Sequence, residues 1–264
     1  MLKFHADKFV ELSNYFVKVS TVTEFVEGDF IPKASGNETL PQRLDNMKDI
    51  CEEIGLDFSA KHVEKVKKQL LSDRTSLKDF MQLLNELESR ISDELSNLSV
   101  MLITRKKADY YEQASLFGNG VFNRFPMANF DIEEAGKCFA TVRHTACVMH
   151  LQRVLEIGLK GFGNYLNAMA SIKSAQPSWQ NVLEVTAKEI KNRTSTKTWT
   201  SSSEQMYAEG IQAFLVAVKT AWRNPSMHAD AKYTEEVAED IFNSVKGFMR
   251  HLAKHLDEKG DFTP

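Results

Sequence analysis

The chain has 264 residues, a length that suits one large domain or two smaller ones and allows a sizeable hydrophobic core. Hydrophobic residues make up 42% of the chain and charged residues 26%, so a soluble, ordered, helix-rich protein is expected rather than a disordered one. The net charge of -3 gives no global signature of nucleic-acid binding, but it leaves room for a basic groove formed locally.

Residues 1–104 are predicted to form a helical N-terminal region. Its clearest element covers residues 75–103, where apolar residues recur every three or four positions, as in a coiled-coil seam. The apolar positions are Leu77, Phe80, Leu84, Leu87, Ile91, Leu95, Leu98 and Leu102. We therefore expect one long, continuous amphipathic helix that packs in a core or in a dimer.

A linker or loop is predicted over residues 105–130. Gly118, Gly120 and Pro126 lie close together there, and residues of these types interrupt helices. The two glycines do not follow a predicted strand and lack a third glycine at the right place, so they do not form a dinucleotide-binding fingerprint. The basic and aromatic residues of 104–111 fit either a solvated helix start or a surface that stacks on RNA bases.

Residues 131–264 are predicted to form an antiparallel four-helix bundle. Apolar residues follow helical spacing in four successive segments, at about 132–169, 177–191, 205–223 and 234–256. Thr234 is the expected N-cap of the last segment. Short loops join most of these helices, which favours antiparallel packing. No segment is a convincing strand, so the predicted fold class is all-α.

The first of these segments, 132–169, carries apolar residues on two faces. The main stripe consists of Val148, Leu151, Leu155, Leu159, Phe162 and Leu166. The opposite face is half apolar and half basic, with Phe139 and Ile157 beside charged residues. A helix in an isolated bundle needs only one apolar face. We therefore expect a homodimer that buries the second face between subunits.

The cysteines and the apolar runs favour a cytoplasmic protein. The three cysteines are Cys51, Cys138 and Cys147, an odd number without regular spacing, which argues against a disulfide framework and for reduced thiols. Charges interrupt every apolar window at the start of the chain, so a signal peptide is not expected. No run of about 18 apolar residues occurs, so no membrane span is expected.

The stretch AWRNPSMHAD, residues 221–230, places polar side chains at a break between two predicted helices. Pro225 disfavours the helical conformation at Asn224, so the third helix is expected to end near Arg223. An arginine matches a phosphate with its planar donors, and a histidine such as His228 carries a proton near neutral pH. Cleavage of RNA by its own 2′-OH needs such a pair and requires no metal. Asn224 can orient the histidine or bind a phosphate oxygen.

This pattern resembles the active motif of HEPN domains, in which an arginine, a polar residue, a few variable positions and a histidine join the last two helices of a bundle. Arg223, Asn224 and His228 match those positions. The stretch 133–160 also resembles the first long helix of bacterial HEPN-like proteins. The resemblance covers about residues 130–257, whereas the N-terminal half matches no family.

The resemblance implies a metal-independent endoribonuclease of toxin–antitoxin, anti-phage defence or RNA-processing systems. It implies RNA as substrate, a homodimer in which the motifs of two subunits form one cleft, and an antitoxin or regulatory partner. Some HEPN-like domains do not catalyse a reaction, so the alternative is a module that dimerises and binds a nucleotide, RNA or a partner protein. In a third, purely structural interpretation, Arg223 caps its helix and His228 is a surface residue in a turn.

Arg143, His150 and Arg153 share one face of the first predicted bundle helix. They fit the lining of an RNA groove, and they fit equally a set of salt bridges between subunits. His251 and His255 are four residues apart, a spacing that can hold a metal, but no third ligand is evident beside them. No metal site and no cofactor are expected.

Overall fold

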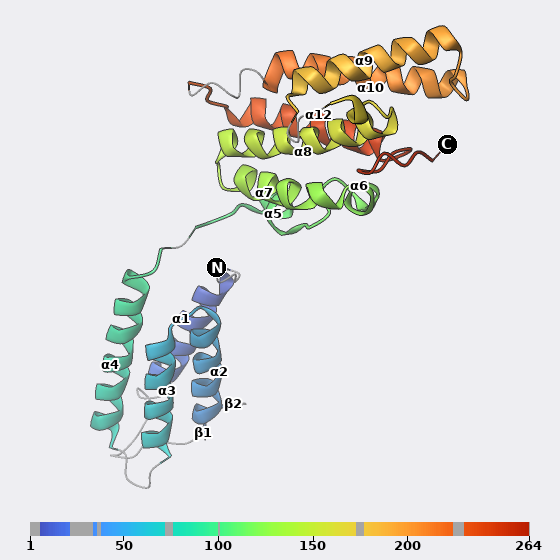
Figure 1. Ribbon diagram of the computed structural model, residues 1–264. Coiled ribbons are helices and arrows are strands. Elements are labelled where there is room, and N and C mark those ends of the chain that lie inside the picture. The colour runs from blue at the N-terminus through green and yellow to red at the C-terminus, as the bar shows by residue number, and fades with distance from the viewer. Residues whose placement is uncertain are drawn as a thin grey trace. The chain divides into compact units, whose positions relative to one another are not determined.

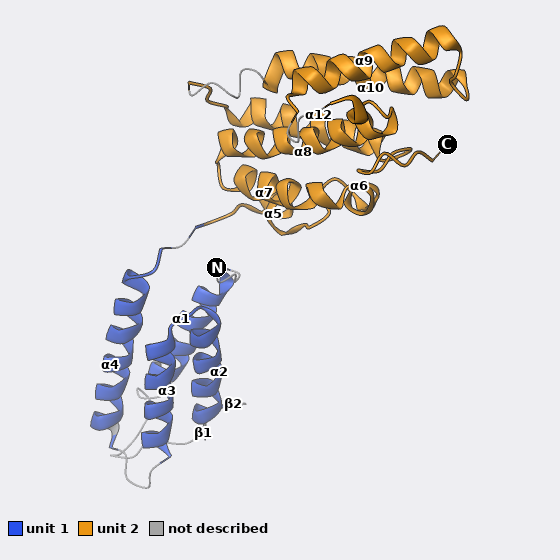
Figure 2. Cartoon of the chain, in the orientation of Figure 1, with its two compact units in different colours: residues 1–101 blue, residues 102–264 orange. Residues whose placement is uncertain are grey.

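The computed structural model describes residues 6–21, 34–35, 38–71, 76–99, 101–172, 177–223 and 230–263 (Figure 1). The chain divides after Met101 into two compact units, here called unit 1 (residues 1–101) and unit 2 (residues 102–264) and coloured separately in Figure 2. The division falls three residues before the boundary expected after residue 104.

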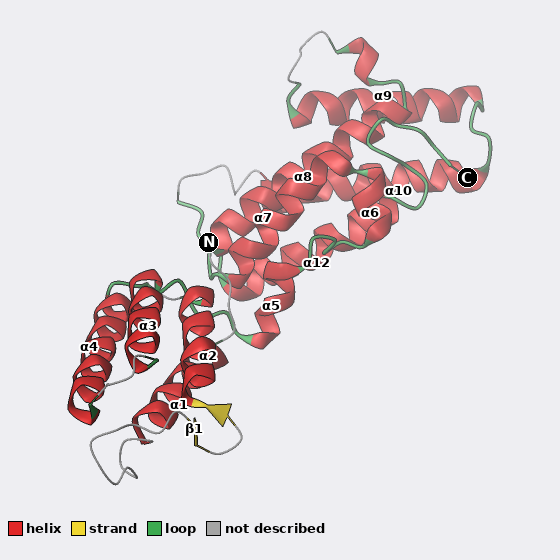
Figure 3. Cartoon of the chain, turned by 90° about the horizontal axis from the view of Figure 1, so that it is seen from below, coloured by secondary structure: helices red, strands yellow, loops and turns green. Residues whose placement is uncertain are grey.

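Both units are built from helices, which confirms the all-α class (Figure 3). In the described parts of the chain, the only strands are β1 (Ala34–Ser35) and β2 (Glu38–Thr39), which form one short antiparallel pair. A single bridge also joins Leu256 to Phe262. None of the described helices is long and apolar enough to cross a lipid bilayer.

The described part of unit 1 contains four helices, each packed against the one before it. They are α1 (Asp7–Thr21), α2 (Leu40–Glu53), α3 (Asp57–Leu70) and α4 (Leu77–Ser96). Leu44, Met47, Val63 and Phe80 are fully or almost fully buried in its core. Thr39 starts α2 with a capping box, because its side chain accepts from the backbone N–H of Gln42 and the Gln42 side chain accepts from the N–H of Thr39.

α4 is the long helix expected over residues 75–103. It is continuous through its middle, as predicted, but it ends at Ser96. The side chains of Ser96 and Asn97 both donate to the carbonyl of Asp93 at 2.8 Å, and such bonds compete with the next helical turn. Leu98 and Leu102 therefore lie beyond the helix and are 40% and 78% exposed.

The side chain of Glu94 near the end of α4 caps the start of α3. Its carboxylate accepts from the backbone N–H of Phe58 at 3.0 Å and from that of Ser59 at 2.6 Å. Leu56, the residue before α3, has no side chain that can make this cap. The register of α4 against α3 is thus fixed by a charge at the positive end of a helix.

Unit 2 is arranged around α8, which packs against α7, α9 and α12. In Figure 1, α5, α6 and α7 form one layer, α8 and α12 a middle layer, and α9 and α10 the third. The elements are α5 (Arg105–Glu112), α6 (Asn119–Arg124), the 3-10 helix η2 (Pro126–Ala128), α7 (Asn129–Ala140), α8 (His144–Tyr165), the 3-10 helix η3 (Met169–Ser171), α9 (Trp179–Thr196), α10 (Ser202–Val218), the π-helix η4 (Lys219–Arg223) and α12 (Glu235–Leu252).

The segment 105–130 is not the linker that the sequence suggested. It forms α5, α6 and η2, and α5 packs along α7. Phe117, Val121 and Phe125 are buried in the core of unit 2. The ring of Tyr110 is partly buried and lies 4.8 Å from that of Phe139, so this side of α5 packs against the core of unit 2.

The glycine and proline residues of this segment begin short helices instead of preventing them. Gly118 adopts a φ of 91° directly before α6, a conformation that favours glycine. Pro126 occupies the first position of η2, where a missing N–H costs little. The buried aromatic residues between these positions hold the segment on the core, and a pattern of breakers alone does not reveal that.

The single helix expected over residues 132–169 is in fact two helices, α7 and α8. Val142 between them adopts a left-handed φ of 61°, and the N–H of Arg143 donates to the carbonyl of Cys138 at 2.8 Å. The chain reverses there, and α7 folds back along α8. Phe139 of the second apolar face is therefore buried within the chain, whereas Ile157 is only partly buried, and the homodimer stays a proposal.

Candidate functional site

The predicted catalytic motif begins at the end of a π-helix. α10 continues into η4, whose last residue is Arg223, and the arginine side chain is half-buried. Asn224 and His228 lie outside the described residues. A π-helical turn is rare, and such turns occur frequently at functional sites. The described chain is thus helical up to the first motif residue and departs there from ordinary α-helical hydrogen bonding.

The other flank of the motif is attached to the start of α8. The backbone N–H of Tyr233 donates to the Thr145 hydroxyl at 3.2 Å, although the two residues are 88 positions apart. Thr234 then caps α12 by accepting from the N–H of Val237 at 3.4 Å, as the sequence predicted. The described residues that follow the motif therefore begin close to the first turn of α8.

Charged side chains from three helices meet near this point. Lys107 of α5 contacts the carboxylate of Glu235 in α12 at 2.7 Å, and His144 of α8 lies 3.9 Å from the same carboxylate. The hydrogen bond from Lys107 lowers the pKa of the Glu235 carboxyl. The ammonium of Lys107 also lies 5.3 Å from the ring centre of Phe139. These contacts join α5 to the first turns of α8 and α12, the two helices beside which the chain resumes after the motif.

A second cluster is fully described and joins α7 to α8. Asp131, in the first turn of α7, is only 3% exposed. One of its carboxylate oxygens accepts from Nδ1 of His150 at 2.8 Å and from Nε of Arg153 at 2.7 Å. A buried carboxylate is costly unless it is paired and hydrogen-bonded, and these two partners meet that need.

The same two partners keep polar groups available at the surface. The side chain of Arg153 is 66% exposed and that of His150 is 26% exposed. Among the described residues, Nε2 of His150 and the terminal guanidinium nitrogens of Arg153 have no hydrogen-bond partner. A histidine whose ring is oriented by a buried carboxylate can hold or move a proton, and an arginine beside it can bind a phosphate.

An exposed aromatic ring borders this cluster. Phe130 is 64% exposed, and its ring lies edge-on to that of His150 with 6.4 Å between the centres. Exposed aromatic rings beside cations are the elements that stack on unpaired bases. Asp131, His150, Arg153 and Phe130 are called the His150 cluster below.

The structure brings together two of the three residues proposed to line an RNA groove. His150 and Arg153 share the carboxylate of Asp131 within the chain. Arg143 lies at the N-cap of α8, seven residues before His150, and outside the His150 cluster. In the described part of the chain Arg143 forms no ion pair.

Sequence reasoning missed Asp131 and Phe130. Their position beside α8 depends on the reversal at Val142, which the apolar pattern does not indicate. The only signal was a carboxylate at the first residue of the predicted bundle region, Asp131, directly after an aromatic residue at the end of the predicted linker, Phe130. Within the described residues, no group of three or more His, Cys, Asp or Glu side chains lies close enough to hold a metal ion.

No protein-family model matches the chain, and no curated protein or solved structure is significantly similar to it. The assignment of the candidate site therefore uses only the residues of this chain and their geometry.

Proposed function

We propose that unit 2 is an HEPN-like four-helix bundle, formed by α8, α9, α10 and α12, and that the protein is a metal-independent endoribonuclease. The observation that carries the proposal is the π-helix that ends at Arg223, directly before Asn224 and His228. A rare helical distortion at the first residue of an Arg-Asn-x3-His motif favours a functional role for that motif over a simple helix cap.

In this proposal the reaction is attack of a 2′-OH on the adjacent phosphodiester. His228 accepts the proton of the 2′-OH, and the new O–P bond forms as the bond from phosphorus to the 5′-oxygen breaks. Arg223 stabilises the negative charge that develops on the phosphate oxygens. A second imidazole, supplied by the other subunit of a homodimer, protonates the leaving 5′-oxygen. Asn224 orients the histidine or a phosphate oxygen.

The His150 cluster supports an RNA substrate. An anion-binding arginine, an oriented histidine and an exposed phenyl ring lie on one surface of unit 2. Phosphate contacts and base stacking together can hold a single strand on such a surface. The proposal fits a cytoplasmic protein of toxin–antitoxin, anti-phage or RNA-processing systems, controlled by an antitoxin or another regulatory partner.

A second candidate function is a non-catalytic module that binds RNA, a nucleotide or a partner protein. The observation that favours it is that the His150 cluster uses residues of α7 and α8 and none of the motif residues. Such a surface can bind RNA whether or not Arg223 and His228 perform chemistry.

The test is the rate at which the purified full chain, freed of any inhibitory partner, cleaves a broad panel of single-stranded RNAs in the presence of a chelator. We expect cleavage by the wild type and a loss of about 10²- to 10⁴-fold in His228→Ala and in Arg223→Ala. Asn224→Ala is expected to lose less, because water can replace part of an orienting hydrogen bond. His251→Ala, which changes an exposed histidine of α12, is the matched control and should cleave normally.

Two outcomes decide against parts of this proposal. If the wild type leaves every RNA uncut but still binds RNA, the non-catalytic module is the better description. If His228→Ala cleaves as fast as His251→Ala, the motif is not the catalytic site.

A further inference from the structure

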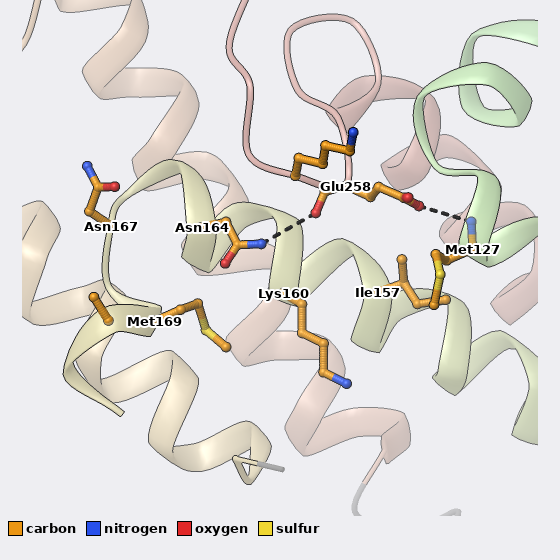
Figure 4. Close-up of a pocket in the computed structure, with 9 residues that line it drawn as sticks. Met127, Ile157, Lys160, Asn164, Asn167, Met169 and Glu258 are labelled. Atoms are coloured by element: carbon orange, nitrogen blue, oxygen red, sulfur yellow. Dashed lines mark hydrogen bonds between the residues drawn. The ribbon is translucent and has the colours of Figure 1, made fainter. Parts of the chain in front are cut away.

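A pocket of about 680 Å³ lies along α8, beyond the His150 cluster (Figure 4). Its walls come from α8, η2, η3 and the turn that follows α12. The lining residues are Met127, Ile157, Lys160, Asn164, Asn167, Met169, Ala170, Glu258 and Lys259. A volume in this range is typical of sites for small organic ligands.

Close packing fixes the wall formed by residues 257–260. A Cβ on Gly161 of α8 would come within 2.9 Å of the Asp257 carbonyl oxygen, so the turn can approach α8 this closely only at a glycine. Gly260 has a φ of +92°, and a Cβ there would lie 2.5 Å from the backbone nitrogen of Tyr165. This wall of the pocket is therefore held in place by the packing of the chain itself.

Hydrogen bonds hold the polar side chains of that wall. One carboxylate oxygen of Glu258 accepts a hydrogen bond from the backbone N–H of Met127 at 2.9 Å. The backbone carbonyl of Glu258 accepts a hydrogen bond from Asn164 Nδ2 at 3.5 Å (Figure 4). The carboxylate of Glu258 is thus engaged with the wall itself. The Oδ1 of Asn164 is left as an acceptor that a ligand can use.

The remaining lining combines apolar faces with cations and amides. Figure 4 shows Lys160 between Met169 on one side and Ile157 with Met127 on the other. Lys160 contacts Glu156 at 2.9 Å, but both side chains are more than two-fifths exposed, so this pair is weak and can yield to a phosphate. Thioether and aliphatic side chains suit the faces of a planar ring, whereas amides suit its polar edge.

The pocket continues the surface of the His150 cluster. His150, Arg153, Ile157, Lys160 and Asn164 follow one another at intervals of three or four residues, so they form one ridge along α8. At 1.5 Å per residue, Lys160 lies about 15 Å along the helix from His150. The two cations of this ridge, Arg153 and Lys160, are seven residues apart, which suits a ligand that carries successive phosphates.

We propose that this pocket binds a nucleotide of single-stranded RNA, whose backbone then follows the α8 ridge to Arg153 and His150. The base lies between Met127, Ile157 and Met169, and Asn164 contacts its polar edge. Lys160 binds the adjoining phosphate. This inference rests on the proposed RNA substrate and adds the place where the strand is held. A free mononucleotide has the same chemistry, so the experiment must distinguish it from a residue of RNA.

The experiment follows the methionine methyl resonances of the full chain by NMR. The probes are a short single-stranded 2′-O-methyl RNA, which lacks the attacking hydroxyl and cannot be cut, and, separately, adenosine monophosphate. We expect the RNA to shift the methyls of Met127 and Met169 and to leave that of Met206, an exposed residue of α10, in place. The monophosphate is expected to shift them only at much higher concentration, because it cannot reach Arg153.

A lysine variant tests the ridge by affinity. Lys160→Met should weaken binding of the 2′-O-methyl RNA for all sequences and reduce the slope of log affinity against log salt by about 1. Lys188→Met, on the exposed face of α9, is the matched control and should bind as the wild type does. Asn164→Ala should lose about tenfold in discrimination between bases while keeping the salt slope. Thermal unfolding checks that each variant is folded.

Unmoved Met127 and Met169 methyls in the presence of saturating RNA would overturn the pocket as an RNA site. Equal affinity for the monophosphate and the RNA would refute the proposal that an RNA strand follows the α8 ridge. The pocket would then be a site for free nucleotides. Because the probe cannot be cut, these results do not depend on His228. Shifted methyls in a protein that cleaves no RNA would leave the pocket standing and refute only the nuclease.

Discussion

Asp131 in α7 accepts a hydrogen bond from Nδ1 of His150 in α8 at 2.8 Å, across the reversal of the chain at Val142. This one contact joins two helices that the apolar pattern shows as a single helix. It also fixes which nitrogen of the histidine ring faces the protein and which faces outward. Because Arg153 shares the same oxygen, the stability of the α7–α8 pair and the chemistry of the exposed surface depend on one carboxylate.

Replacement of Asp131 by Asn should destabilise the protein. The amide keeps the volume but removes the negative charge that strengthens the hydrogen bond from Arg153, at an expected cost of about 1–3 kcal/mol in the free energy of unfolding. Urea unfolding followed by circular dichroism measures the change. Glu133→Gln on the same helix is the control, because its pair with Lys137 is exposed and worth less than about 1 kcal/mol. Equal stability of the two variants would show that the His150 cluster does not stabilise the packing of α7 against α8.

Replacement of Gly136 by Ala should displace α5 from α7. A Cβ at this position would lie 2.3 Å from the Tyr110 carbonyl oxygen and 2.3 Å from the Leu116 side chain. Such a clash with backbone is expected to cost about 1–3 kcal/mol or more, measured by thermal unfolding. Gly210→Ala in α10 meets no atom within 4 Å and should instead stabilise the helix by about 0.5–1 kcal/mol. If Gly136→Ala unfolds at the same temperature as the wild type, residues 105–112 do not pack against α7 as described.

The protein should lose stability as the pH rises above 9. Burial raises the pKa of the Cys51 and Cys147 thiols from 9.0 to about 12. Between these values the unfolded chain releases protons that the folded chain keeps, so the contribution of these thiols to stability is complete below pH 9 and is lost as the pH rises toward 12. Unfolding at a series of pH values measures the loss, and the Cys51→Ala/Cys147→Ala variant should show a smaller one. An identical pH dependence in that variant would contradict the burial of the two thiols.

The same burial predicts slow reaction with thiol reagents at pH 8. Cys138 is only partly buried, so it should react first, while Cys51 and Cys147 should react only after unfolding in urea. Mass spectrometry of the labelled peptides identifies the order. Rapid labelling of Cys147 in the folded protein would show that the core of unit 2 opens easily.

The sequence predicts the helical class and several helix ends because these depend on local spacing and local caps. The N-cap at Thr234 and the middle of α4 are examples. The reversal at Val142 could not be predicted in this way. Valine rarely adopts a positive φ, and only the packing of α7 against α8 compensates for the strain.

The sequence offers residue types for the candidate site but not its geometry, and the roles of Arg223, Asn224 and His228 stay predictions. The Arg223, Asn224 and His228 motif is visible from chemistry and spacing, whereas the π-helix before it has no local sequence signal that we could use. His150 and Arg153 were singled out as basic residues on one face. Their partner Asp131 became visible only after the helix was known to fold back on itself.

The proposed reaction cuts RNA through the 2′-OH of the substrate, without a metal. The most direct measurement is the chemistry of the fragment ends produced by the full chain from a single-stranded RNA in excess chelator. We expect 2′,3′-cyclic phosphate and 5′-hydroxyl ends, formed by the wild type and not by His228→Ala. Fragments with 3′-hydroxyl and 5′-phosphate ends, or cleavage that stops when the chelator is added, would contradict it.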